Sequence, residues 1–130
     1  MGVLKVPVSY GEVLDKITIL EIKSERIVDT AKLSNVRREL DELRQTWNDS
    51  GLNHPELPRL KASLKAVNEA LWEIEDAIRV KESRREFDDE FIRLARSVYV
   101  ENDQRAAVKK EINQLLGSEL VEEKSYKSYR

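Results

Sequence analysis

The feature that most constrains the fold is an unbroken heptad pattern between residues 57 and 78. Seven apolar side chains alternate at spacings of three and four residues: Leu57, Leu60, Leu64, Val67, Leu71, Ile74 and Ile78. This spacing places all of them along one face of an α-helix, as in helices that pack side by side. The pattern therefore predicts a helix over residues 56–86, which would be roughly 45 Å long at the α-helical rise per residue.

The stretch DKITILEIKSER, residues 15–26, permits two interpretations, because its β-branched centre partly alternates like a strand. Ser9 and Glu12, however, have the spacing of a capping box, which marks a helix start. The residues that follow continue along one helical face: Val13, Ile17, Leu20, Ser24 and Ile27. The helix cost of β-branched residues is a few tenths of a kcal/mol each, less than burial of the isoleucines returns. We therefore predict a helix over residues 9–29.

A further helix is predicted from five apolar residues at the same spacings: Leu33, Val36, Leu40, Leu43 and Trp47. Gly51 has the position of a helix C-cap, and the proline-containing segment LNHPELP forms the connection that follows. We expect Trp47 and Trp72 to fill core layers or an oligomer interface.

A fourth helix begins near residue 88, where Asp88 or Asp89 can act as its N-cap. It carries four apolar residues on one face: Phe91, Leu94, Ala95 and Val98.

The end of this fourth helix is ambiguous in the sequence. Asn102 or Asp103 can cap a fifth helix that ends at Gly117. If the helix instead runs on unbroken, Glu101 and Arg105 occupy its inward face. The sequence leaves both alternatives open.

Heptads joined by short connections predict an all-α fold, an antiparallel up-and-down helical bundle of four to five helices built from long helical hairpins. We expect one domain over residues 1–130, with a short extended N-terminus (1–8) and a mobile C-terminal tail (about 118–130). The shorter helices cannot cover all of the longest one, so we expect apolar surface to remain for a second subunit, as in a homodimer.

Composition narrows the function classes. The chain has no cysteine and a single histidine, His54, so any metal would be a hard ion such as Mg²⁺ held by carboxylates, and we expect no other cofactor. With 23 basic and 25 acidic residues, a nucleic-acid partner is not expected. We also expect no membrane span and, in the absence of a secretory segment, a cytoplasmic protein. The glycine-rich and catalytic motifs of common enzyme classes do not occur.

A first candidate site is acidic. Glu69, Glu73 and Asp76 share one face of the predicted long helix, and helical nucleotide pyrophosphatases use stacked carboxylates of this kind to hold Mg²⁺. An ordinary solvated acidic face explains the same pattern, and we favour that interpretation.

A second candidate lies on the first helix. Its residues share one side of that helix, with Glu21 over Thr18 and next to the apolar stripe: Asp15, Thr18, Ile22, Glu25 and Arg26. Such a mixed set can bind a dicarboxylate, as in small helical chorismate mutases. Ion pairs at the rim of a bundle, worth ~0–1 kcal/mol each, are the alternative and the one that the pattern alone favours.

A third candidate comprises Asn102, Arg105 and Lys109, which share a face of the last predicted helix. If they point inward they need an acidic partner, because unpaired buried charge is costly. The first helix offers three: Asp15, Glu21 and Glu25. An N-cap followed by an exposed basic face is an equally good interpretation.

Three segments carry a resemblance: VPVSYGEVLDKITILEIKSERI, KLSNVRREL and YVENDQRAAVKKEINQLLGSELVEEKSY. Together they resemble a family of uncharacterised small helical proteins of bacteria and phages, over nearly the whole chain. The resemblance implies a genomic context beside surface-polysaccharide or glycosyltransferase genes, with no established activity. Because the segments that mark the family include the second and third candidates, we predict one polar site between the first and last helices, formed by Asp15, Lys16, Glu21, Arg26, Asn102 and Arg105.

Two functions follow as hypotheses. The leading one is a non-enzymatic helical interaction or accessory module, a homodimer that assists a partner such as a polysaccharide-assembly enzyme. The alternative is a small all-α enzyme or ligand-binding protein, similar to chorismate mutases or Mg²⁺-dependent nucleotide pyrophosphatases. This alternative requires the carboxylates and the Arg or Lys groups to converge in a concave pocket.

Overall fold

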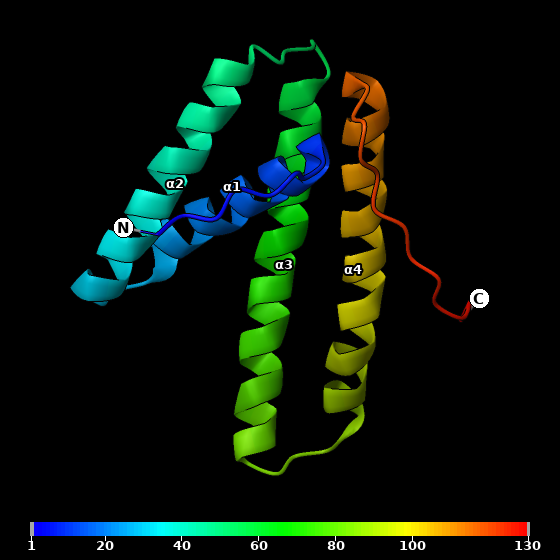
Figure 1. Cartoon of the computed structure of the whole chain (residues 1–130). Coiled ribbons are helices and arrows are strands. Elements are labelled where there is room, and N and C mark those ends of the chain that lie inside the picture. The colour runs from blue at the N-terminus through cyan, green and yellow to red at the C-terminus, as the bar shows by residue number, and fades with distance from the viewer. Residues whose placement is uncertain (1, 130) are drawn as a thin grey trace.

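The computed structural model describes residues 2–129, and within them the chain forms four helices and no strand. The helices, coloured along the chain in Figure 1, are α1 (Tyr10–Arg26), α2 (Thr30–Ser50), α3 (Leu57–Ser83) and α4 (Asp89–Leu116). The prediction of an all-α bundle is confirmed.

Helix α1 starts where the sequence predicts. The Ser9 hydroxyl accepts a hydrogen bond from the Glu12 backbone N–H at 3.1 Å, so the stretch with the strand-like centre is helical. The Glu12 carboxylate pairs with Lys109 of α4, 2.5 Å from its Nζ. Of the two residues of the expected capping box, Ser9 caps the helix, whereas the Glu12 side chain binds α1 to α4. Helix α1 ends at Arg26, before the predicted boundary, because Ile27 adopts an extended conformation.

Helix α4 is a single helix of 28 residues, which decides between the two alternatives left open by the sequence. Asp88 is its N-cap and accepts from the Phe91 N–H at 3.0 Å. The helix ends at Gly117, whose φ of 68° is a left-handed conformation that glycine adopts without strain. Neither Asn102 nor Asp103 begins a new helix, since both lie inside the same helix.

Helix α1 is the centre of the packing. Its backbone lies close to that of each of the other three helices, whereas within residues 2–129 the backbone of α2 lies close to that of α1 alone. Helices α3 and α4 run antiparallel side by side, and α1 crosses them obliquely near the start of α3 and the end of α4 (Figure 1). The buried core lies at these crossings and consists of Leu14, Ile17, Leu20, Val36, Leu40, Leu57, Leu60, Leu64 and Ile112.

The buried core does not extend along the whole α3–α4 hairpin. The last buried residue of α3 is Asn68, and the first of α4 is Ile112. Residues 76–99, which we call the distal hairpin, lie beyond α1 and α2 in Figure 1. Four of its large hydrophobic side chains are 41–57% exposed: Val80, Phe87, Ile92 and Tyr99.

The C-terminal segment after Gly117 runs back along α4 before it turns away (Figure 1). Glu122 accepts hydrogen bonds from the Ser9 hydroxyl and, at 2.9 Å, from the Asn113 amide. Further along, the Tyr129 hydroxyl donates to Asp103 at 2.9 Å. These contacts link the C-terminal segment to the start of α1 and to the outer face of α4. None of the helices in residues 2–129 combines the length and hydropathy that a membrane span requires.

Candidate functional site

The start of α1 lies unusually close to α4, and Gly11 makes this approach possible. The Gly11 N–H donates to Asn113 Oδ1 at 2.7 Å, and a Cβ added at Gly11 would lie only 2.6 Å from the Lys109 carbonyl oxygen. Asn113 is 1% exposed, so its amide bridges α1 and the C-terminal segment from a buried position. The backbone of α1 therefore reaches α4 with no side chain in between.

Lys109 lies at the centre of this junction. Its ammonium group is 2.5 Å from Glu12, 3.8 Å from Glu122 and 3.9 Å from Asp15. Burial acts to raise the pKa of the Glu122 carboxyl, but the hydrogen bond from Ser9 and the charge of Lys109 outweigh it and hold that pKa below its usual range. Of the three acidic partners that the sequence offered for an inward Lys109, only Asp15 lies near it. The closest partner is Glu12, which was not among the three.

A second buried polar group lies further along α1, where it faces α3. Asn68 Nδ2 donates to Asp15 Oδ1 at 2.8 Å and to Thr18 Oγ1 at 3.0 Å. The Thr18 hydroxyl in turn donates to the Asp15 backbone carbonyl at 2.8 Å. All three residues are at most 5% exposed. Because Asp15 approaches both Asn68 and Lys109, it connects the polar contacts on α3 with those on α4.

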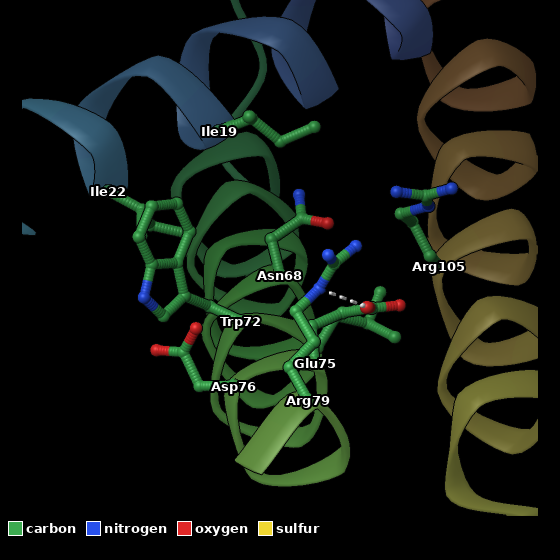
Figure 2. Close-up of a pocket in the computed structure, with 9 residues that line it drawn as sticks. Ile19, Ile22, Asn68, Trp72, Glu75, Asp76, Arg79 and Arg105 are labelled. Carbon is green, nitrogen blue, oxygen red and sulfur yellow. Dashed lines mark ion pairs between the residues drawn. The ribbon is translucent and has the colours of Figure 1, made fainter. Parts of the chain in front are cut away.

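Beside Asn68 lies a cavity of about 400 Å³ between α1, α3 and α4. Figure 2 shows Arg105 extending into it from α4, opposite the α3 side chains. The walls carry Ile19, Ile22, Leu71 and Trp72, and the polar lining comprises Asn68, Glu75, Asp76, Arg79 and Arg105. An indole, an amide, carboxylates and guanidinium groups around one space can bind and orient a small molecule.

The two arginines of the cavity differ in their surroundings. Arg79 pairs with Glu75, one turn away on the same helix, at 3.6 Å (Figure 2). Arg105 is half-buried and has no hydrogen-bond or ion-pair partner in residues 2–129. Its guanidinium is therefore available to a molecule in the cavity.

Glu21 points to other partners. It accepts hydrogen bonds from Arg44 of α2 at 2.9 Å and from Lys61 of α3 at 3.3 Å. Burial acts to raise the pKa of the Glu21 carboxyl, but the two cations outweigh burial and lower that pKa. Arg44 and Lys61 line a second cavity, of about 370 Å³. This second cavity has no lining residue in common with the cavity beside Asn68.

The other predicted residues lie apart from one another. Arg26, at the end of α1, pairs with Glu73 and lies 3.9 Å from Glu69. Lys16 is exposed, and Asn102 is half-buried three residues before Arg105. Of the six predicted residues, the structure thus brings Asp15 and Arg105 to the two sides of Asn68, while Glu21 and Arg26 contact other parts of the bundle.

The acidic candidate on α3 is explained by charge pairing. Glu69 and Glu73 neutralise Arg26, and Asp76 lines the cavity beside Trp72 (Figure 2). Within residues 2–129, no three acidic or histidine side chains are placed as a group that could hold a metal ion.

Sequence reasoning did not find Asn68 or the role of Trp72. In the sequence, Asn68 lies next to the heptad residue Val67 and resembles a surface residue. Only the crossing of α1 over α3 gives it buried partners.

These features define a small all-α protein in which a central helix holds an antiparallel hairpin through buried polar contacts, with a ligand-sized cavity between them. The chain belongs to DUF6165, a family of unknown function whose model matches residues 4–129. No curated protein matches the chain, and no solved structure matches it.

Proposed function

We propose that the protein is a non-enzymatic helical interaction module that self-associates through its distal hairpin. The observation that carries this proposal is the loss of burial along the hairpin. The heptad positions continue beyond Asn68, but no residue of α3 after it and no residue of α4 before Ile112 is fully buried. The heptad residues Ile74 and Ile78 are only half-buried, and the hairpin also exposes the four large hydrophobic side chains named above. Apolar surface of this kind on a helical hairpin is typical of a helix-pairing surface.

The accessible surface supports the same proposal. The chain exposes 9333 Å², whereas a compact monomer of 15.1 kDa is expected to expose about 7,100 Å². Exposed large hydrophobic side chains occur in both ends of the chain and in the distal hairpin. A stable dimer of standard size buries about 800 Å² per partner, well below the excess.

A second copy of the chain suits the charges of the distal hairpin. Residues 76–99 contain six acidic and six basic residues, so the segment has no net charge. A strongly acidic or basic partner would find no complementary field there, whereas two copies meet without net repulsion. Most oligomers of identical chains use a two-fold axis, which brings the same patch of each copy together.

The module would act as an accessory protein in the cytoplasm. The resemblance to proteins encoded beside surface-polysaccharide genes supports polysaccharide assembly as its setting. In this proposal self-association builds a four-helix unit from two hairpins, and α1 and α2 remain outside it for a further partner.

The test compares two matched substitutions by size-exclusion chromatography with light scattering. Ile92→Asp places a carboxylate on the 51% exposed Ile92 of the distal hairpin, and Val28→Asp makes a similar change at the 88% exposed Val28 between α1 and α2. We expect Ile92→Asp to shift the mass from about 30 kDa to about 15 kDa at the same helicity, because the interface would bury an unpaired charge. Val28→Asp should stay dimeric. A wild-type monomer, or a dimer unaffected by Ile92→Asp, would refute the proposal.

A further inference from the structure

We infer that the cavity between α1, α3 and α4 binds a small organic oxyanion, a carboxylate or phosphate ester, that carries an apolar ring and a hydrogen-bond donor. This binding site goes beyond the proposed self-association and does not rest on it. The inference is drawn from three features of the cavity: an unpaired guanidinium, a buried acceptor that faces the cavity, and an apolar wall of suitable size.

The guanidinium is that of Arg105. Most charged groups that face another helix in this protein have a partner, as Lys109, Glu21 and Arg26 show. Arg105 reaches the cavity from α4 and has no partner in residues 2–129. A planar guanidinium offers two parallel N–H donors that match the oxygens of a carboxylate or phosphate.

The acceptor is Asn68 Oδ1. The orientation of this amide is fixed, because Nδ2 faces a carboxylate oxygen of Asp15 and the hydroxyl of Thr18, which already donates its own proton to a carbonyl. Oδ1 therefore points the other way, toward the Arg105 side in Figure 2. Within residues 2–129, Oδ1 accepts no hydrogen bond, whereas every fully buried polar side-chain atom has a partner. Oδ1 therefore cannot be fully buried. Oδ1 is thus reached from the cavity, although Asn68 is only 5% exposed.

The apolar wall of the cavity is the reason for expecting an apolar ring in the ligand. Trp72, Leu71, Ile19 and Ile22 form the apolar part of the lining, and the volume of about 400 Å³ falls in the range of pockets that hold small ligands. The indole of Trp72 offers a flat surface against which a ring can stack.

The carboxylates restrict the ligand further. Glu75 and Asp76 lie on the α3 side of the cavity, across from Arg105 (Figure 2). Glu75 is paired with Arg79, so Asp76 is the carboxylate that disfavours a second negative charge and favours a ligand with a hydroxyl or amine directed toward α3. The ligand is therefore polarised, with the oxyanion at Arg105 and the donor at Asn68.

The experiment uses NMR of the ¹⁵N-labelled full chain, titrated separately with 4-hydroxybenzoate and 4-aminophenyl phosphate. The chain has two tryptophans, and Trp47 lines the other cavity, so its indole N–H serves as an internal control. We expect one or both probes to shift the Trp72 indole signal saturably below 10 mM and to leave the Trp47 signal unchanged.

Two variants and one neutral analogue complete the test. Arg105→Gln should weaken binding at least tenfold, whereas Arg93→Gln, the same change at an exposed position of α4, should have no effect. The uncharged 4-hydroxybenzyl alcohol should not bind. The inference is overturned if neither probe shifts Trp72, if Arg105→Gln binds as tightly as wild type, or if the neutral analogue binds equally well. Repeating the titration with Ile92→Asp separates this result from the outcome for self-association.

Discussion

Substitution of Gly11 by alanine is the sharpest test of the α1–α4 junction. The new Cβ would lie 2.6 Å from the Lys109 carbonyl oxygen and 3.0 Å from Asn113 Oδ1, whereas ordinary contacts begin near 3.4 Å. Because the closest atom belongs to backbone, the two helices must move apart by most of an ångström. Such overpacking costs about 1–3 kcal/mol, and loss of the buried hydrogen bond from Gly11 to Asn113 costs about as much again.

Alanine also gains about 0.5–1 kcal/mol over glycine in a helix, which offsets part of this cost. We therefore expect Gly11→Ala to lower the free energy of unfolding by about 2–4 kcal/mol, a Tm decrease of roughly 10 °C. Urea denaturation followed by circular dichroism measures the change. Gly2→Ala, where the added Cβ meets no atom within 4 Å, is the control and should leave stability unchanged. If Gly11→Ala were as stable as wild type, the close approach of α1 to α4 would be wrong.

Two further changes test single contacts. Arg44 and Lys61 lower the pKa of the Glu21 carboxyl in the folded protein. The ionised carboxylate therefore stabilises the fold at pH values above the pKa that Glu21 has in the unfolded chain, and this stabilisation is lost as the pH falls through the pKa that Glu21 has in the folded protein. Glu21→Gln should therefore destabilise the protein at pH 7 and much less at pH 3 in urea titrations, and an equal effect at both pH values would contradict the ion pairs. Asp88→Ala should lower the Tm by a few degrees in thermal scans, because the N-cap of α4 is lost. Asp88→Asn, whose side chain can still cap the helix, should retain most of the wild-type stability. Equal decreases in Tm for the two variants would argue against the cap.

The local signals in the sequence predicted most of the fold. Ser9, Asp88, Gly51 and Gly117 begin or end helices as their residue types indicate, because capping depends on groups within a few residues. The heptad spacing predicted α3 for the same reason.

The candidate site was less predictable, because it depends on how the helices cross. Lys109 and Arg105 occupy neighbouring turns of α4, yet Lys109 pairs with three acidic groups, whereas Arg105 has no ion-pair partner in residues 2–129. Glu21 and Asp15 are also on one helix, but α1 crosses between α2 and the hairpin, so they face different neighbours. No sequence pattern within one helix specifies that crossing.

The contact between Ser9 and Glu122 has the same origin. The two residues are 113 positions apart; the sequence marks Ser9 only as a helix cap, and Glu122 looks like an ordinary surface residue in its segment. Their meeting depends on Gly11, whose missing side chain lets α1 approach α4. In the sequence alone, a single glycine near a helix start does not indicate which other helix, if any, will approach it closely.

Sedimentation equilibrium of the unmodified chain between 1 and 100 μM tests the central claim of self-association most directly, because it gives the mass without a surface or a label. Self-association through the distal hairpin predicts a mass of twice 15.1 kDa at the upper end of this range, with dissociation on dilution or a constant dimer. A mass of 15.1 kDa at every concentration would contradict it.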